Sequence, residues 1–178
     1  RAEEKGLKRS LFERLVDLGI EPLLLSTQYR MHPAISKFPN QHFYSDRLDD
    51  GIKSENRLAP AGLLWPDWDN PVAFVPVDGG EVVSPDGTSR ENPAEVSWVI
   101  KILNDILEAG EITKKDIGII TPYAGQVRAI RNSMSEKLDD VEVKTVDGYQ
   151  GREKEVIIFS CVRSNTEQNI GFLSEMRR

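Results

Sequence analysis

Apolar residues in the second half of the chain follow two spacings. They recur at helical intervals between residues 93 and 110, and they form short unbroken runs at 117–120 and 156–159. A helical interval predicts a helix with one buried face, whereas a short apolar run predicts a buried strand. Strands that alternate with helices indicate an α/β fold, a parallel sheet with helices on both faces.

The helix predicted from residue 93 has the clearest boundaries. The sequence Asn92-Pro93-Ala94-Glu95 places a capping residue, a proline at the first helical position and a glutamate at the third. Gly110 is expected to end the helix. We expect its apolar stripe to be core and not a cofactor site; the stripe is formed by Val96, Val99, Ile100, Leu103, Ile106 and Leu107.

Other elements are expected from shorter signals. Ser10 would cap a helix over 11–18 that Gly19 stops, with Glu13 completing a capping box. The pattern also predicts a short buried strand over 23–25, then a helix from Pro33 to about residue 38. We further expect strands over 72–77 and 141–146, a helix after residue 123, and inward packing of Ile35, Phe38, Phe43, Val127, Ile130 and Met134.

The stretch 144–159 combines two strands with a polar turn. Asp147-Gly148 is a turn dipeptide, and residues 149–153 are dense in groups that can bind a nucleotide or a phosphate. The run 156–159 is expected to be buried on both faces. A polar loop at the carboxyl end of a buried parallel strand is where open α/β sheets bind ligands. Spacing alone leaves a surface turn between two core strands equally open.

Composition narrows the function classes. The chain has 178 residues, 39% hydrophobic and 29% charged, which suits one folded domain or one large lobe. Its net charge is −6, so a purely electrostatic nucleic-acid binder is disfavoured. Nucleic-acid binding would need hydroxyls, backbone amides and a few Arg or Lys side chains. We expect Cys161 to be an inert core thiol, because it lies in an apolar stretch.

The sequence does not support a metal-binding protein or a membrane-spanning protein. His32 and His42 have no cysteine partners and no metal-ligand spacing. No apolar run is long enough to span a membrane. Residues 45–92 are irregular, and their aspartates are interpreted as solvated surface. Trp65 and Trp68 within them form either a small satellite core or an exposed patch for a partner.

Four blocks resemble one protein family. TVDGYQGREKEVIIFSCVRSN, from residue 145, resembles motif V of superfamily 1 helicases of the up-frameshift and senataxin group. STQYRMHPAISKFPNQHFY (26–44) resembles the QYRMHP block, ITPYAGQV (120–127) motif IV, and NIGFLSEMRR (169–178) the approach to motif VI. The resemblance implies the second RecA-like lobe of a two-lobe helicase, a P-loop NTPase fold, over 23–178 after a lead-in over 1–22.

The resemblance implies a set of nucleotide-binding residues. Tyr29 would stack on adenine, and Arg30 would reach the γ-phosphate as the catalytic group. Gln150 and Gly151 would place their loop against the cleft, and Glu153 would bind the ribose. An aromatic face suits a purine, and a guanidinium presents a fixed fork of donors to phosphate oxygens. Without the resemblance, the tyrosine is a residue at the core edge and the arginine a loop support.

The same family's motif IV and motif V loops contact the nucleic-acid backbone. This implies Thr121, Pro122 and Thr145 as contacts for single-stranded RNA or DNA. The open alternative is that both threonines cap local turns. Tyr149 stands where the family commonly has phenylalanine, and no role carries over to the charges at 152 and 154.

Some expected parts are missing from the sequence. It contains no G-x-x-x-x-G-K-[ST] loop and no acidic pair after an apolar strand. ATP with Mg²⁺ would therefore be held by the first lobe, and the motif VI arginine would follow Arg178. We expect a fragment of an ATP-dependent helicase of the cytoplasm or nucleus that is inactive alone. A non-enzymatic binding module and a DNA-repair helicase remain alternatives, and a 5′ to 3′ direction is implied by the family only.

Overall fold

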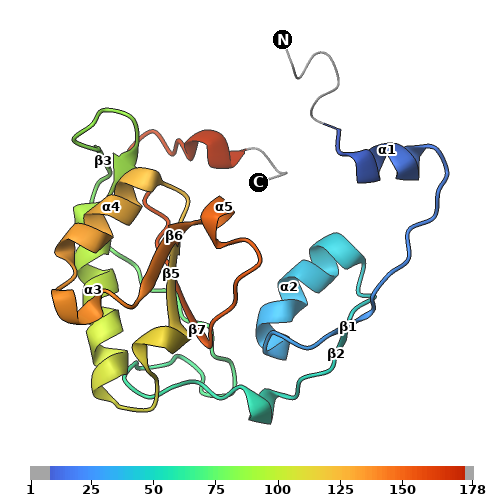
Figure 1. Ribbon diagram of the computed structural model, residues 1–178, viewed down its shortest axis with the longest axis horizontal. Helices are drawn as coiled ribbons and strands as arrows, with labels where there is room; N and C mark the ends of the chain where they lie inside the picture. The colour runs from blue at the N-terminus through green and yellow to red at the C-terminus, as the bar shows by residue number, and fades with distance from the viewer. Residues whose placement is uncertain (1–8, 175–178) are drawn as a thin grey trace. The chain divides into compact units, whose positions relative to one another are not determined.

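The computed structural model describes residues 9–174 (Figure 1). Contacts divide the chain into two compact units, which are described separately. Unit 1 is Arg1–Leu58 with Asp69–Pro71, and unit 2 is Ala59–Trp68 with Val72–Arg178. The expected boundary between a lead-in over 1–22 and a lobe over 23–178 stays a prediction. The first eight residues of that lead-in and the last four of the block 169–178 lie outside the described residues.

Unit 2 is built on a parallel three-stranded sheet. Its strands are β5 (Ile117–Thr121), β6 (Glu142–Thr145) and β7 (Val156–Phe159), in the order β6-β5-β7. Both pairings are parallel, and Thr121 lies opposite Thr145 where β5 and β6 end. The predicted strands are thus confirmed to within a residue, and the fold is α/β of the RecA-like, P-loop NTPase type.

Two helices cover one face of this sheet (Figure 1). They are α3 (Pro93–Glu108) and α4 (Ala124–Ser133). The start of α3 is confirmed, because the Asn92 side chain accepts a hydrogen bond from the Glu95 amide, and Gly110 follows its end with φ +79°. The shared core is formed by Val96, Val99, Leu103, Ile106, Ile117, Ile119, Ile130 and Val143, with Val127 and Met134 packed against it.

The second face is thinly covered within unit 2. The one-turn helix α5 (Val146–Tyr149) places Tyr149 over Gly118, where a Cβ atom would lie 1.9 Å from the tyrosine oxygen. Ile157 lies opposite Gly118 and is 44% exposed, and Phe159 is 52% exposed. The prediction that 156–159 is buried on both faces is therefore wrong, because one face of β7 lacks a covering helix in this unit.

Unit 1 contains α1 (Leu11–Asp17), β1 (Thr27–Gln28), α2 (Pro33–Tyr44), β2 (Asp49–Asp50) and η1 (Ser54–Asn56). The Ser10 cap and the stop at Gly19 are confirmed. The predicted strand over 23–25 is wrong: the strand lies two residues later and pairs with β2, and Leu23 is 98% exposed. The expected inward packing of Ile35, Phe38 and Phe43 is also wrong, since all three are exposed.

The segment 45–92 is irregular, as expected. Its antiparallel pair is β3 (Val82–Val83) with β4 (Arg90–Glu91). The strand expected over 72–77 is wrong: side-chain burial alternates there, but no neighbouring strand pairs with it in the described part of the chain. Trp65 is half-buried and donates to the Pro60 carbonyl at 2.6 Å, whereas Trp68 is exposed.

Three short 3₁₀ turns complete unit 2, η2 (Lys114–Asp116), η3 (Glu136–Leu138) and η4 (Gly171–Ser174). Cys161 is exposed, so its predicted core position is wrong. The chain leaves the sheet after Phe159. The residue that is fully buried in this segment is Val162, whose φ is +71°. Although the residue is exposed, neighbouring atoms partly desolvate the Cys161 thiol, and this together with the charge of Glu95 raises its pKa. Within residues 9–174, no helix is long and apolar enough to cross a membrane.

Candidate functional site

The loop that carries Tyr29 and Arg30 is held by the side chain of Gln28. The Gln28 Oε1 atom accepts hydrogen bonds from the Arg30 amide at 2.9 Å and the Met31 amide at 2.8 Å. Its Nε2 atom donates to the Met31 carbonyl at 2.7 Å and to Asp50 at 2.6 Å. One amide side chain thus fixes the backbone on both sides of Arg30.

Tyr29 and Arg30 in this loop have exposed side chains. Tyr29 is 69% exposed, and its ring lies directly over Gly51, where an added Cβ would be 2.3 Å from a ring carbon. Arg30 is exposed as well. The buried ring of His32 caps α2 by accepting the Ala34 amide at 3.0 Å. His32 therefore orders the end of this loop and the start of α2.

The carboxyl ends of β5 and β6 bring the predicted strand-binding residues together. Thr121 is fully buried, and its hydroxyl accepts from the Tyr123 amide at 3.5 Å. Thr145 caps α5 by accepting the Gly148 amide at 3.2 Å. Pro122 is half-buried and lines a surface pocket. Both threonine hydroxyls therefore hold local turns, and the half-buried Pro122 contributes to the surface beside them.

The loop after α5 leaves this edge of the sheet. Gln150, Gly151 and Glu153 are exposed, and Gly151 has φ +79°. Arg152 pairs at 2.6 Å with Glu142, which begins β6, and Lys154 donates to the carbonyl of Lys115, just before β5. The loop thus runs along the second face toward the amino ends of the strands.

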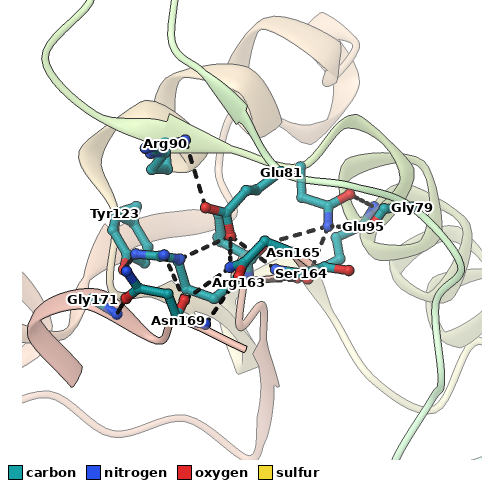
Figure 2. A network of polar contacts seen from close by, with 12 residues as sticks. Gly79, Glu81, Arg90, Glu95, Tyr123, Arg163, Ser164, Asn165, Asn169 and Gly171 are labelled. Atoms are coloured by element: carbon teal, nitrogen blue, oxygen red, sulfur yellow. Dashed lines mark hydrogen bonds and ion pairs between the residues drawn. The ribbon is translucent and has the colours of Figure 1, made fainter. Parts of the chain in front are cut away.

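A polar network ties the segment after β7 to the residues before β3 (Figure 2). The nearly buried carboxylate of Glu81 accepts from the Arg163 Nε atom at 2.8 Å, the Ser164 amide at 2.9 Å and Asn165 at 3.2 Å. Burial raises the pKa of Glu81, but the hydrogen bonds from these groups outweigh it, and the pKa is lowered overall. Glu81 is therefore ionised and holds the segment after β7 by accepting these hydrogen bonds.

Arg163 spans this network with three separate contacts. Besides Glu81, its guanidinium donates to the Tyr123 hydroxyl at 3.3 Å and to the Asn169 carbonyl. The hydrogen bond with Tyr123 and the pair with Glu81 raise the pKa of Arg163 despite its burial. The loop before α4, the segment before β3 and the segment after β7 all contact this one cation.

A second carboxylate, Glu95, holds the same segment at its start. It accepts from the Val162 amide at 2.9 and 3.0 Å and from the Ser160 hydroxyl at 2.5 Å. Asn92, which caps the same helix, donates to the carbonyls of Gly79 at 3.1 Å and Val162 at 3.3 Å. The first turn of α3 therefore fixes the chain where it leaves β7.

The predicted nucleotide-binding residues fit ATP by their chemistry. Tyr29 offers an exposed ring face and Arg30 an exposed guanidinium on a fixed backbone, while Gln150 and Glu153 offer exposed polar groups. Tyr29 and Arg30 belong to unit 1, and the other residues belong to unit 2. Among residues 9–174, no group of three His, Cys, Asp or Glu side chains could hold a metal ion.

A family model described as an AAA domain, AAA_12, matches residues 7–178. The chain belongs to this AAA domain family. The domain is 44% identical over 185 residues to a regulator of nonsense transcripts 1 homolog from Drosophila melanogaster, covering all of this chain and 16% of that protein. It is 42% identical to the ATP-dependent helicase NAM7 of Saccharomyces cerevisiae and 43% identical to the ATP-dependent helicase upf1 of Schizosaccharomyces pombe, covering 19% and 20% of those proteins. It thus spans about a sixth to a fifth of these relatives.

Sequence reasoning about this AAA domain missed the residues that position the loops. Gln28 lies inside the QYRMHP block but carries no charge and no catalytic chemistry, so nothing in its type marks it. Across these segments, Glu81 and Glu95 contact partners 65 to 84 residues away in the sequence. The only signal for Glu95 was its place in the helix start, where it suggested a capping role.

Proposed function

We propose that this AAA domain is the second RecA-like lobe of an ATP-dependent helicase that moves on single-stranded RNA or DNA. The observation that carries the proposal is the loop around Gln28, which presents an aromatic face and a guanidinium on a backbone fixed from both sides. The names of the relatives, ATP-dependent helicases and regulators of nonsense transcripts, support it. In this proposal the protein works in the cytoplasm or the nucleus.

In the proposed mechanism each unit contributes separately to ATP binding. Tyr29 stacks on the adenine, and Arg30 binds the γ-phosphate oxygens and stabilises the charge that develops on them. Gln150, Gly151 and Glu153 contribute from the loop after α5, with Glu153 on the ribose. Bound ATP supplies the free energy of its hydrolysis. The first lobe of the same protein is proposed to bind Mg²⁺ and to supply the other groups that contact the phosphates.

The strand would be bound at the carboxyl ends of β5 and β6. Thr121 and Thr145 shape the two turns through their hydroxyls, and Pro122 with the adjacent backbone offers the contact surface. Backbone amides bind phosphates without reading bases, so RNA and DNA are both candidates. Closure of the two lobes would couple ATP binding to the affinity for the strand.

The test is strand-stimulated ATPase of a longer protein that carries both lobes, with RNA and DNA compared in parallel. Arg30→Ala should lower kcat by about 10³ or more, because an arginine finger acts on the transition state. The matched control is Arg14→Ala, an exposed arginine of α1 in the same unit, which should leave kcat unchanged. The preferred strand distinguishes an RNA helicase from a DNA-repair helicase.

A second variant separates chemistry from positioning. Gln28→Ala keeps the guanidinium but removes the two hydrogen bonds that fix the amides of Arg30 and Met31. We expect a loss of about 10- to 100-fold in kcat, because a catalytic group that is loosely held spends less time in position. Unchanged turnover in Arg30→Ala would remove Arg30 from the mechanism. Absence of any strand-stimulated turnover in the folded wild type would favour a non-enzymatic binding module.

A further inference from the structure

A pocket of about 390 Å³ opens beside the carboxyl end of β5, within unit 2. Its walls come from three places in the sequence: the hairpin of β3 and β4, the loop that leads into α4, and the segment after β7. The volume is near the lower end of the range for small-molecule sites, which corresponds to a ligand of about one nucleotide.

The charged side chains in the wall of the pocket are both basic. The chain has a net charge of −6, yet the charged side chains that line the pocket are Arg90 and Arg163, with no acidic residue among the lining residues. Arg163 is nearly buried and held by Glu81, Tyr123 and Asn169 (Figure 2), so it forms a fixed wall.

Arg90 differs from Arg163 in its freedom to bind a ligand. Its side chain is 43% exposed, and its contact with Glu81 is 3.6 Å long. Arg90 faces the Oε1 atom of Glu81, whereas Arg163, Ser164 and Asn165 donate to Oε2. At 3.6 Å the contact with Oε1 is too long for a hydrogen bond, so Glu81 satisfies Arg90 only in part. Among the described residues, the side-chain partner of Arg90 is Glu81. Most N–H donors of the Arg90 guanidinium are therefore available to an anion.

The pocket also has an aromatic side. The Tyr123 and Phe172 rings lie 5.0 Å apart at 59°, and both line the pocket. Tyr123 is buried beneath, whereas Phe172 is 40% exposed and can offer a face to a base. An exposed ring beside an arginine is the pairing that proteins use to bind single strands without reading sequence.

We infer that this pocket binds one nucleotide of the single strand, with its phosphate on Arg90 and its base against Phe172. The inference rests on the proposed function and extends the strand-binding surface from Pro122 to the β3–β4 hairpin. Arg163 and Glu81 act as positioning residues, since they hold the pocket wall in place. Because a phosphate contact and a stacked ring do not read base edges, binding should not depend on sequence.

The experiment measures binding of the 178-residue chain to a fluorescent single-stranded oligonucleotide of about 12 nucleotides, over a range of salt concentrations. Arg90→Ala should weaken binding about tenfold at low salt and reduce the slope of log K against log[salt] by about 0.7, the value for one lost phosphate contact. Arg90→Lys should retain most of the slope. Arg128→Ala is the matched control, because Arg128 pairs with Asp86 near the pocket but does not line it.

A second variant tests the aromatic contact. Phe172→Leu keeps an apolar neighbour for Tyr123 but loses the stacking face, so affinity should fall about fivefold with an unchanged salt slope. Phe172→Tyr should restore it. Circular dichroism checks that each variant is folded. Arg90 is only partly exposed, but its removal leaves Glu81 bound to Arg163, Ser164 and Asn165.

The outcomes separate this inference from the proposed function. Binding by the wild type that is unaltered in Arg90→Ala, or reduced equally in Arg128→Ala, would overturn the pocket and leave the Arg30-dependent ATPase test standing. Binding that depends on base sequence would also overturn it. No strand binding by the folded wild type at low salt would overturn the pocket and the proposed strand grip together.

Discussion

Tyr149 has a hydroxyl that is buried without a hydrogen-bond partner, the one such side-chain atom among residues 9–174. Its ring fills the space left by Gly118, and burial raises the pKa of the phenol, so the group stays neutral. A buried hydroxyl that lost its water contacts and gained none in return lowers stability. The ring of Tyr149 therefore stabilises the fold by packing over Gly118, whereas its hydroxyl does not.

The prediction at the residue scale is that Tyr149→Phe leaves the free energy of unfolding unchanged or raises it by up to about 1 kcal/mol. Urea unfolding followed by tryptophan fluorescence measures this. Tyr123→Phe is the matched control, because the Tyr123 hydroxyl accepts from Arg163, and its loss should cost about 1 kcal/mol. A loss of more than about 1 kcal/mol in Tyr149→Phe would show that its hydroxyl has a partner in solution.

A titration is expected within the β3–β4 hairpin. The pKa of Asp86 is lowered to about 2 by hydrogen bonds from the Ser84 hydroxyl and the Thr88 amide, with the Arg128 charge adding to them. A lowered pKa means that the stabilisation is complete above the ordinary pKa of about 3.9 and is lost as the pH falls through about 2. Carboxyl-carbon NMR shifts of Asp86 should therefore show a midpoint near 2. In Ser84→Ala the midpoint should move up toward the ordinary value; a wild-type midpoint close to 4 would contradict the hairpin geometry.

At the scale of an element, Asn92 does more than cap α3. Asparagine and aspartate cap helices about equally well, so a residue that served only as a cap would tolerate Asn92→Asp. Here the amide nitrogen also donates to the carbonyls of Gly79 and Val162, and the residue is 1% exposed. A carboxylate would place negative charge against two carbonyl oxygens and next to Glu95.

We therefore expect Asn92→Asp to lower the free energy of unfolding by about 3 kcal/mol at neutral pH. The loss arises because the carbonyls of Gly79 and Val162 lose their donor and because the new carboxylate repels Glu95. Chemical unfolding of the two proteins measures it. Ser10→Asp at the exposed cap of α1 is the control and should be neutral within about 0.5 kcal/mol. Equal tolerance at both caps would mean that the Asn92 contacts contribute nothing beyond capping.

The elements also show what a sequence can predict. The helix over 93–108 was predicted closely because its cap, its proline and its apolar spacing are all local. The strands expected over 23–25 and 72–77 failed because a strand exists only through a partner, and the partner is set by the tertiary fold. In the same way, the types of Tyr29 and Arg30 suggested a site. The Gln28 clamp and the Glu81 anchor could not be predicted, since both depend on contacts between loops.

Over the whole molecule, burial is unevenly shared between the two units. Every buried hydrophobic side chain of the described residues, from Val96 to Val162, belongs to unit 2. The buried side chains of unit 1 are those of His32 and Ser36, both polar. Because burial of apolar surface is the main source of stability, unit 1 has little of its own, although it carries Tyr29 and Arg30.

Amide hydrogen exchange of the 178-residue chain should therefore divide along the two units. Amides of β5, at the centre of the sheet, should exchange only through unfolding of unit 2, whereas those of α2 should exchange through local opening of small free energy, near the low end of the range from about 0 to the global value. Exchange followed by mass spectrometry at peptide resolution measures this, with α3 as the internal reference for a helix of unit 2. If the α2 amides were as protected as those of β5, unit 1 would have a source of stability beyond its own buried side chains. If the expectation holds, a ligand that binds Tyr29 and Arg30 should slow exchange in α2, because it binds the closed form of that unit in preference to the open one.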